Sequence, residues 1–206
     1  MRERILTAAI DVIKQRGMTA ATTKEIARAA GVSEGSLYNH FENKTALFGS
    51  ALAEVAGSMR AAMAELAGSA GKGTVHDNLA RLAGIAVRFY GELLPMTGPV
   101  LGEPEILAWL RAGGPAKEGS PLPAAGPVLG IVGLAGYLEA EQAGGRLAPD
   151  VNPYPLAAAL LGACLQQAFL ARLSGAETVE NIAHLPADPD EYGREIVTTL
   201  LSGHIR

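Results

Sequence analysis

Apolar residues recur every three or four positions along most of the chain, which is the spacing of amphipathic α-helices. The clearest case is residues 2–17, where one side of the predicted helix carries an apolar series: Ile5, Leu6, Ala9, Val12 and Ile13. The alternation typical of a half-buried β-strand is not found, and no stretch repeats with a period of 20–50 residues. The pattern predicts an all-α protein of about nine helices.

The ends of these helices follow from capping residues and helix breakers. Gly17 suits the left-handed residue that ends the first helix. Thr22 and Glu25 have the spacing of a capping box, which starts the second helix. Ser33 and Asn43 are suited to cap the third and fourth. The predicted helices are about 2–17, 22–30, 33–41, 43–66, 75–94, 103–111, 128–142, 155–173 and 190–202.

Residues 23–41 have the spacing of a helix-turn-helix unit. Ala27 is small at the point where the two helices must approach closely, and Gly31 follows four residues later, where the turn needs a positive φ. Val32 and Leu37 supply the apolar contacts that hold the second helix across the first. In such a unit the second helix enters the DNA major groove and the first spans the phosphate backbone.

The segment "TTKEIARAAGVSEGSLYNHFENKTALF" (22–48) resembles the DNA-binding head of the tetracycline-repressor (TetR-type) family of bacterial regulators. The matching features are the threonine-capped helix, "AGVS", "LYNHF" and the lysine that opens the next helix. The detailed match covers roughly residues 2–50. The resemblance implies a helix-turn-helix domain over residues 1–45 and a helical ligand-binding and dimerisation domain over residues 46–206.

Four residues are candidates for contact with DNA phosphates. Lys44 stands in the first turn of a helix, where a cation faces the positive end of the helix dipole and a bound phosphate would reverse the penalty. Without that phosphate, Lys44 is a solvated lysine. The resemblance assigns backbone contact to Lys44, Tyr38 and His40, although both rings could instead pack within the head. Thr23 can offer a hydroxyl and an N–H to a phosphate near its helix start.

Base recognition is expected from exposed residues at the start of the third helix, with one lysine from the second. Asparagine can bind adenine through two bonds, lysine can donate to guanine, and glutamate can accept from cytosine. A glycine permits close approach, and Ser33 is also suited to serve only as a cap. The candidates are Lys24, Ser33, Glu34, Gly35, Ser36 and Asn39, of which we expect about half to touch bases.

A single short recognition helix reads few base pairs, so a dimer that binds a palindromic operator is expected. The segment 155–173 is apolar almost all round, which suits a helix that packs on its own domain and on a partner. The resemblance implies that the helices near 155–173 and 190–202 pair with their copies as a four-helix bundle. The alternative is that both are ordinary core helices.

The resemblance also implies a small-molecule pocket in the body. Aromatic or soft side chains scattered through the middle helices could line an apolar pocket with a few polar tips, or could simply belong to the core. Trp109 lies between Gly/Pro-rich stretches that could act as an entrance. The candidates are Phe89, Tyr90, Met96, Trp109, Tyr137 and Phe169, and a mostly apolar effector is expected.

The composition shows an uneven distribution of charge along the chain and indicates the cellular compartment. The net charge is −4, and residues 1–45 hold seven Lys/Arg against five Asp/Glu while the rest holds ten against sixteen. A mildly basic head on an acidic body can bring only its head to an anionic partner.

Cys164 is the only cysteine, which excludes an intrachain disulfide and favours a reducing compartment. Polar residues interrupt the most membrane-like segment, 156–173, so we expect a cytoplasmic protein rather than a membrane protein.

Enzymatic chemistry finds little support. The four histidines show no metal-ligand spacing, and no glycine-rich phosphate loop is present. Glu139 and Glu141 are two residues apart and diverge on a helix, so they form no carboxylate pair. We therefore expect no cofactor and no metal. The sequence favours a ligand-responsive transcriptional regulator that a small molecule releases from DNA. The alternative is a helical small-molecule-binding or interaction protein whose head no longer reads DNA.

Overall fold

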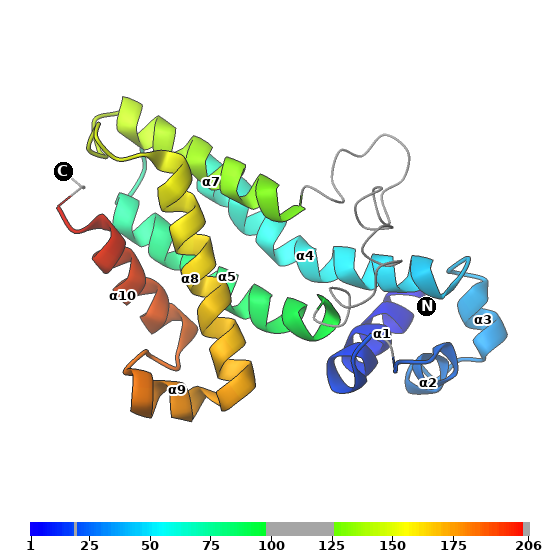
Figure 1. Cartoon of the computed structure of the whole chain (residues 1–206). Coiled ribbons are helices and arrows are strands. Elements are labelled where there is room, and N and C mark those ends of the chain that lie inside the picture. Colours follow the sequence, from blue (N-terminus) through cyan, green and yellow to red (C-terminus); the bar gives the residue numbers. More distant parts are fainter. Residues whose placement is uncertain (19, 98–125, 204–206) are drawn as a thin grey trace. The chain divides into compact units, whose positions relative to one another are not determined.

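The structure is a computed structural model that describes residues 1–18, 20–97 and 126–203. Every regular element within these ranges is an α-helix, and the ranges hold nine of them (Figure 1). The predicted all-α class is confirmed. The predicted helix 103–111, with Trp109, lies outside the described residues.

The chain forms two compact units that both draw on the two longest helices. Helix α4 (Lys44–Gly68) and helix α5 (Val75–Thr97) each contribute residues to both units. The predicted domain boundary after residue 45 falls at the start of α4, inside unit 1. Unit 1 consists of Met1–Gly57 and Glu92–Gly126, and unit 2 of Ser58–Gly91 and Pro127–Arg206.

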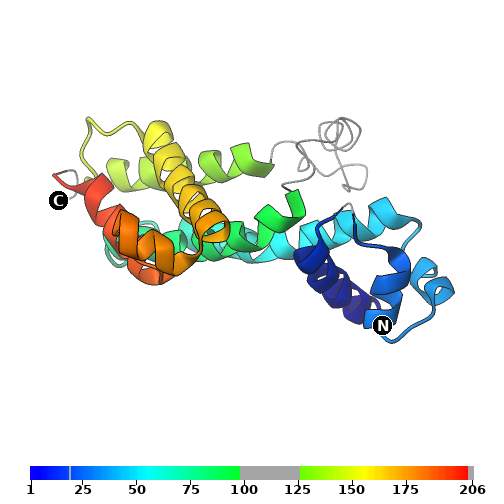
Figure 2. The same cartoon turned by 60° about the horizontal axis from the view of Figure 1, so that its bottom comes forward.

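Unit 1 contains three short helices and the first part of α4 (Figure 2). The short helices are α1 (Arg2–Arg16), α2 (Thr23–Ala29) and α3 (Glu34–Tyr38). The apolar side of each faces inward, as the spacing predicts. The core of this unit includes five side chains with no exposed surface: Ile5, Ile13, Ile26, Leu37 and Leu47.

The predicted caps of unit 1 are confirmed. Thr22 and Glu25 form a complete capping box at the start of α2. Ser33 Oγ accepts a hydrogen bond from the Ser36 N–H (3.1 Å), and Asn43 Oδ1 accepts one from the Ala46 N–H (2.8 Å). These bonds satisfy amide groups that a helix start leaves without partners.

Two details of unit 1 differ from prediction. Helix α3 ends at Tyr38 rather than near Phe41, because the chain tightens into a turn in which the His40 N–H donates to the Leu37 carbonyl at 3.0 Å. Gly17 has φ 79° and ψ 161°, which is a positive φ but not the left-handed helical conformation. Gly31, by contrast, has the predicted positive φ of 65°, and a Cβ there would meet no atom within 4 Å, so conformation alone explains the glycine.

Unit 2 combines parts of α4 and α5 with four further helices. These are α7 (Gly126–Ala143), α8 (Pro153–Ser174), α9 (Ala176–Ala183) and α10 (Pro189–Leu201). Helices α9 and α10 both contact α8, and Figures 1 and 2 agree on this arrangement. The core is aliphatic, with Leu79, Leu82, Leu134, Leu138, Leu160 and Cys164 among its buried members.

Helices α5, α8 and α9 each depart from the sequence prediction in one respect. Helix α5 continues through Pro95 to Thr97, three residues beyond the predicted end at Leu94. Helix α8 begins at Pro153 rather than Pro155, since a proline is tolerated at the first helical position. Helix α9 occupies a stretch for which no helix was predicted, since it has only eight residues and two prolines follow it closely.

Helices α5 and α10 approach each other unusually closely. A Cβ placed on Gly193 would lie 2.7 Å from the Ala80 carbonyl oxygen and 2.9 Å from the Gly84 nitrogen, both backbone atoms of α5. One turn further along α5, Arg88 forms an ion pair with Asp190 at 2.8 Å, which holds the pKa of that carboxyl below its usual range. Glycine at position 193 thus permits a backbone-to-backbone contact.

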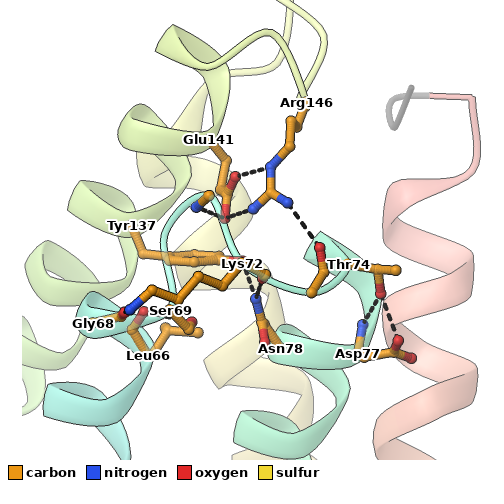
Figure 3. Close-up of polar contacts among 12 residues, drawn as sticks. Leu66, Gly68, Ser69, Lys72, Thr74, Asp77, Asn78, Tyr137, Glu141 and Arg146 are labelled. Carbon is orange, nitrogen blue, oxygen red and sulfur yellow. Dashed lines mark hydrogen bonds and ion pairs between the residues drawn. The ribbon is translucent and has the colours of Figure 1, made fainter.

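A buried ion pair fixes the turn between α4 and α5 (Figure 3). Glu141 on α7 is 1% exposed and binds Arg146 through both oxygens, at 2.5 and 2.6 Å. The Gly71 N–H donates to the same carboxylate at 3.3 Å, and Arg146 also donates to the Gly73 carbonyl at 2.8 Å. Both charges therefore bind backbone groups of one turn.

A second set of bonds in Figure 3 holds the same turn from α5. The Asn78 amide donates to the Lys72 carbonyl at 2.9 Å and to the Tyr137 hydroxyl at 3.0 Å. Burial raises the pKa of Tyr137 to about 12, so the phenol stays neutral and available as an acceptor. As expected from their spacing, Glu141 points inward while Glu139 is exposed.

Helix α8 is the one described helix that is long and apolar enough to cross a membrane, with a third of the relevant window buried in the structure. The core helix of a soluble protein meets the same criterion. Its contacts with α9 and α10 show that part of its surface packs within unit 2.

Candidate nucleic-acid interface

The exposed side of α3 carries the predicted recognition residues. Leu37 is completely buried and faces the core, which turns the opposite side of this short helix outward. Ser36 is half-buried, and the remaining candidates on this segment are exposed: Ser33, Glu34, Gly35, Asn39 and His40. The structure thus brings these candidates together on one surface.

A chain of two side-chain hydrogen bonds connects α2 to α3. The Thr23 hydroxyl donates to Glu34 Oε1 at 2.6 Å, and the Tyr38 hydroxyl donates to Thr23 Oγ1 at 3.4 Å. Thr23 is 9% exposed while Tyr38 is 45% exposed. The bond from Thr23 to Glu34 thus connects α2 to the first residue of α3, and Tyr38 remains partly exposed.

Two cations of this unit lie over aromatic rings. Lys44 Nζ is 5.0 Å from the centroid of the Phe48 ring, one turn along α4. Arg2 lies 5.0 Å from the centroid of the Phe41 ring and donates to Ser50 Oγ at 3.4 Å. A cation–π contact restrains a long side chain without neutralising its charge, so both groups stay available to an anion.

Helix α2 presents two exposed cations one turn apart. Lys24 was expected from the sequence, and Arg28 was not, although its spacing of four residues from Lys24 places both on one side of the helix. Together with Glu34 they line a surface hollow between α2 and α3. The i, i+4 spacing of the two cations is the signal that could have identified Arg28.

The candidate effector-binding residues do not gather at one place. The rings of Phe89 and Tyr90 are in contact, with centroids 5.1 Å apart. Tyr137 instead binds Asn78, eleven residues before Phe89 on α5 and therefore about 16 Å along the helix axis.

The remaining effector candidates are also dispersed. Met96 is buried within unit 1, whereas the other described candidates belong to unit 2. Phe169 is 50% exposed on α8, so in the isolated chain it lines no interior pocket. Trp109 is outside the described residues.

Enzymatic chemistry gains no support from the described residues. Burial raises the pKa of the Cys164 thiol to about 12, which keeps it protonated and poorly nucleophilic. No group of three or more His, Cys, Asp or Glu side chains suited to a metal ion occurs within the ranges the structure describes.

A short capped helix with an exposed polar face, packed across a second helix, has the arrangement of a helix-turn-helix unit. Residues 5–51 match the family described as "Bacterial regulatory proteins, tetR family". This match makes residues 5–51 similar to the DNA-binding domain of that family.

Curated relatives match the same region. The transcriptional repressor BepR of Brucella suis biovar 1 is 49% identical over 47 residues, which is 23% of this chain and 22% of that protein. The regulator AcrR of Shigella flexneri is 43% identical over 47 residues, again 23% of this chain and 22% of its own length. The matched stretch thus spans less than a quarter of either relative. These relatives are transcription regulators, not enzymes.

Solved structures resemble the whole chain. SmeT, the repressor of the Stenotrophomonas maltophilia multidrug efflux pump SmeDEF, superposes with a TM-score of 0.70 and 18% identity, covering 100% of this chain and 91% of SmeT. The Bacillus subtilis regulator FadR, solved in complex with stearoyl-CoA, gives a TM-score of 0.61 and 20% identity, covering 98% and 99%. At this identity the likeness establishes the fold.

Proposed function

We propose that this chain is a cytoplasmic transcriptional repressor that binds a palindromic DNA operator as a homodimer and is released by a small molecule. The observation that carries the proposal is the exposed polar surface of α3, flanked by Lys24, Tyr38 and Lys44. Polar side chains on α3 are suited to read base edges. Lys24 is suited to donate to a base, and Tyr38 and Lys44 are suited to hold phosphates, which set register without reading sequence.

Dimerisation is supported by the outer face of α8. Leu165, Phe169 and Leu173 are 40%, 50% and 71% exposed and recur every four residues, so they form one apolar stripe. Exposed α10 side chains, by contrast, are polar, and its apolar residues Tyr192, Val197 and Leu201 belong to the unit 2 core. We therefore assign most of the proposed dimer contact to α8, with α10 beside it.

Replacing Phe169 with glutamate is expected to dissociate the dimer, because two negative charges would be buried near the centre of the proposed contact. Sedimentation equilibrium of the full chain should show a monomer for Phe169→Glu and a dimer for the wild type. Ala61→Glu places the same charge on an exposed position of α4 and should remain dimeric. A Phe169→Glu variant that sediments as a dimer would remove α8 from the interface.

Release by a ligand is proposed to work through α4. This helix starts with Lys44 in unit 1 and continues into unit 2, so a change in the body that displaces α4 also moves a DNA-contacting residue. The similar fold of the regulator FadR, which was solved in complex with stearoyl-CoA, supports a body that accepts a compound with a long apolar chain. A hundredfold loss of DNA affinity requires a ligand that prefers the released state by about 2.7 kcal/mol.

DNA binding can be tested on the promoter next to the chain's own gene, by measuring affinity across a range of salt concentrations. Each phosphate contact contributes about 0.9 to the slope of log K against log salt. Lys44→Ala removes one such contact from each protomer, so the slope should fall by roughly 2 and affinity by at least about tenfold. Tyr38→Ala should also weaken binding.

Lys72→Ala is the matched control, because Lys72 is an exposed lysine of unit 2 outside the proposed interface. It should leave affinity and slope unchanged. Binding that is absent at low salt, or equal in the wild type and both interface variants, would favour the alternative of a helical ligand-binding or interaction protein that does not read DNA.

A further inference from the structure

The hollow between α2 and α3 combines donors and an acceptor in one place. Its lining includes Lys24, Glu25 and Arg28 from α2 and Glu34 from α3. Lys24 and Arg28 are exposed, and neither lies within ion-pair distance of a carboxylate among the described residues. Of the two carboxylates in the hollow, Glu25 pairs with Arg16 at 2.8 Å, whereas Glu34 forms no ion pair among the described residues.

The Glu34 carboxylate is held in place while keeping acceptor capacity. Its Oε1 accepts the Thr23 hydroxyl at 2.6 Å, and Thr23 is itself 9% exposed and accepts from Tyr38. An ionised carboxylate has about four lone-pair sites, so the bond to Thr23 leaves most of them unused. Glu34 is therefore a positioned acceptor beside two donors.

The combination of two cationic donors with the Glu34 carboxylate suits a base pair of a DNA duplex better than a phosphate. A phosphate offers only acceptors and a negative charge, which Glu34 would repel. The major-groove edge of a G·C pair offers two acceptors on guanine, O6 and N7, and one donor on cytosine, the N4 amine. Arginine or lysine pairs with guanine and glutamate pairs with cytosine, whereas adenine is best matched by asparagine or glutamine.

We propose that the hollow lined by Lys24, Arg28 and Glu34 reads one G·C base pair in each operator half-site. Arg28, with Lys24 beside it, donates to guanine O6 and N7, and Glu34 accepts from the cytosine N4 amine. This inference rests on the proposed DNA-binding function and adds to it the identity of one base pair. It also assigns Arg28 a role in specificity.

Selection of binding sites from a random duplex pool by the full-length protein tests this assignment. The wild type should enrich a symmetric site with one G·C pair at equivalent positions of its half-sites. Substituting that pair by A·T should weaken binding by roughly 5- to 150-fold for each altered half-site. Arg28→Ala should lose the preference for guanine there and keep the preferences elsewhere. Glu34→Gln, which keeps an acceptor for Thr23, should accept A·T at the same position.

Arg4→Ala removes an exposed cation of α1 and should leave the selected sequence unchanged. If Arg28→Ala weakens all sequences equally and lowers the salt slope, Arg28 binds a phosphate and the assignment is wrong. A consensus whose position sensitive to Arg28 and Glu34 is A·T also overturns it. A wild-type pool that enriches no sequence overturns the proposed DNA-binding function as well, so the two failures are distinguishable.

Discussion

Replacing Arg146 by methionine is expected to lower the free energy of unfolding by about 3–5 kcal/mol, since it leaves a buried carboxylate without its cation. Glu141 is 1% exposed, and Arg146 supplies the two shortest of its hydrogen bonds. The change also removes the bond to the Gly73 carbonyl, which loosens the turn between α4 and α5. Thermal and urea unfolding of the full chain measure the effect, and a domain of this size should lose on the order of 10 °C in Tm.

An exposed ion pair of the same unit supplies the control. Arg81 and Glu65 lie 2.9 Å apart, but half or more of each side chain is exposed. Solvent screens such a pair, so Arg81→Met should change stability by less than about 1 kcal/mol. The double change Glu141→Leu with Arg146→Met should recover most of the loss, because it removes both charges together. Equal effects of Arg146→Met and Arg81→Met would mean that Glu141 is solvated.

Gly193→Ala is expected to destabilise the chain by roughly 1–3 kcal/mol through a clash that side-chain motion cannot relieve. The added Cβ would meet the Ala80 carbonyl oxygen at 2.7 Å and the Gly84 nitrogen at 2.9 Å, and both belong to the backbone of α5. Helices α5 and α10 would have to separate, which also weakens the Arg88–Asp190 ion pair. Thermal unfolding measures the loss of stability, and sedimentation shows whether the proposed dimer persists.

Gly136→Ala is the same chemical change, but it is expected to keep or raise the stability of the chain. Gly136 lies within α7, is exposed, and a Cβ there would meet no atom within 4 Å. Alanine is the better helix former by up to about 1 kcal/mol, so this variant should be as stable as the wild type or more so. If both variants unfold at the same temperature, the contact between α5 and α10 is less close than the structure shows.

The sequence predicted the local structure of unit 1 well because short-range rules determine it. The capping box at Thr22, the caps at Ser33 and Asn43, and the positive φ of Gly31 all depend on residues within four positions of one another. The shared surface of the recognition residues followed from the burial of Leu37. What remained hidden was the bond from Thr23 to Glu34, which joins positions on different helices.

The body was harder to predict because its arrangement depends on contacts between distant segments. No local pattern shows that Glu141 meets Arg146 and the Gly71 N–H, or that Tyr137 binds Asn78. Phe169 was a pocket candidate because it is aromatic. The sequence does not show how much of its ring is exposed, because that depends on which segments pack on α8. Helix α9 was missed because it has only eight residues, which is little more than two helical turns.

The last turn of α5 affects how this chain can be divided for engineering. Residues 92–97 belong to the same compact unit as α1, α2 and α3, where Glu92 pairs with Lys14 of α1 at 3.4 Å and Met96 is fully buried. Unit 1 is therefore discontinuous in sequence. A chimera that joined residues 1–57 to a foreign body would leave Lys14 without its carboxylate and would omit part of the core that supports α1. A head intended for transfer between regulators should carry this end of α5 with it.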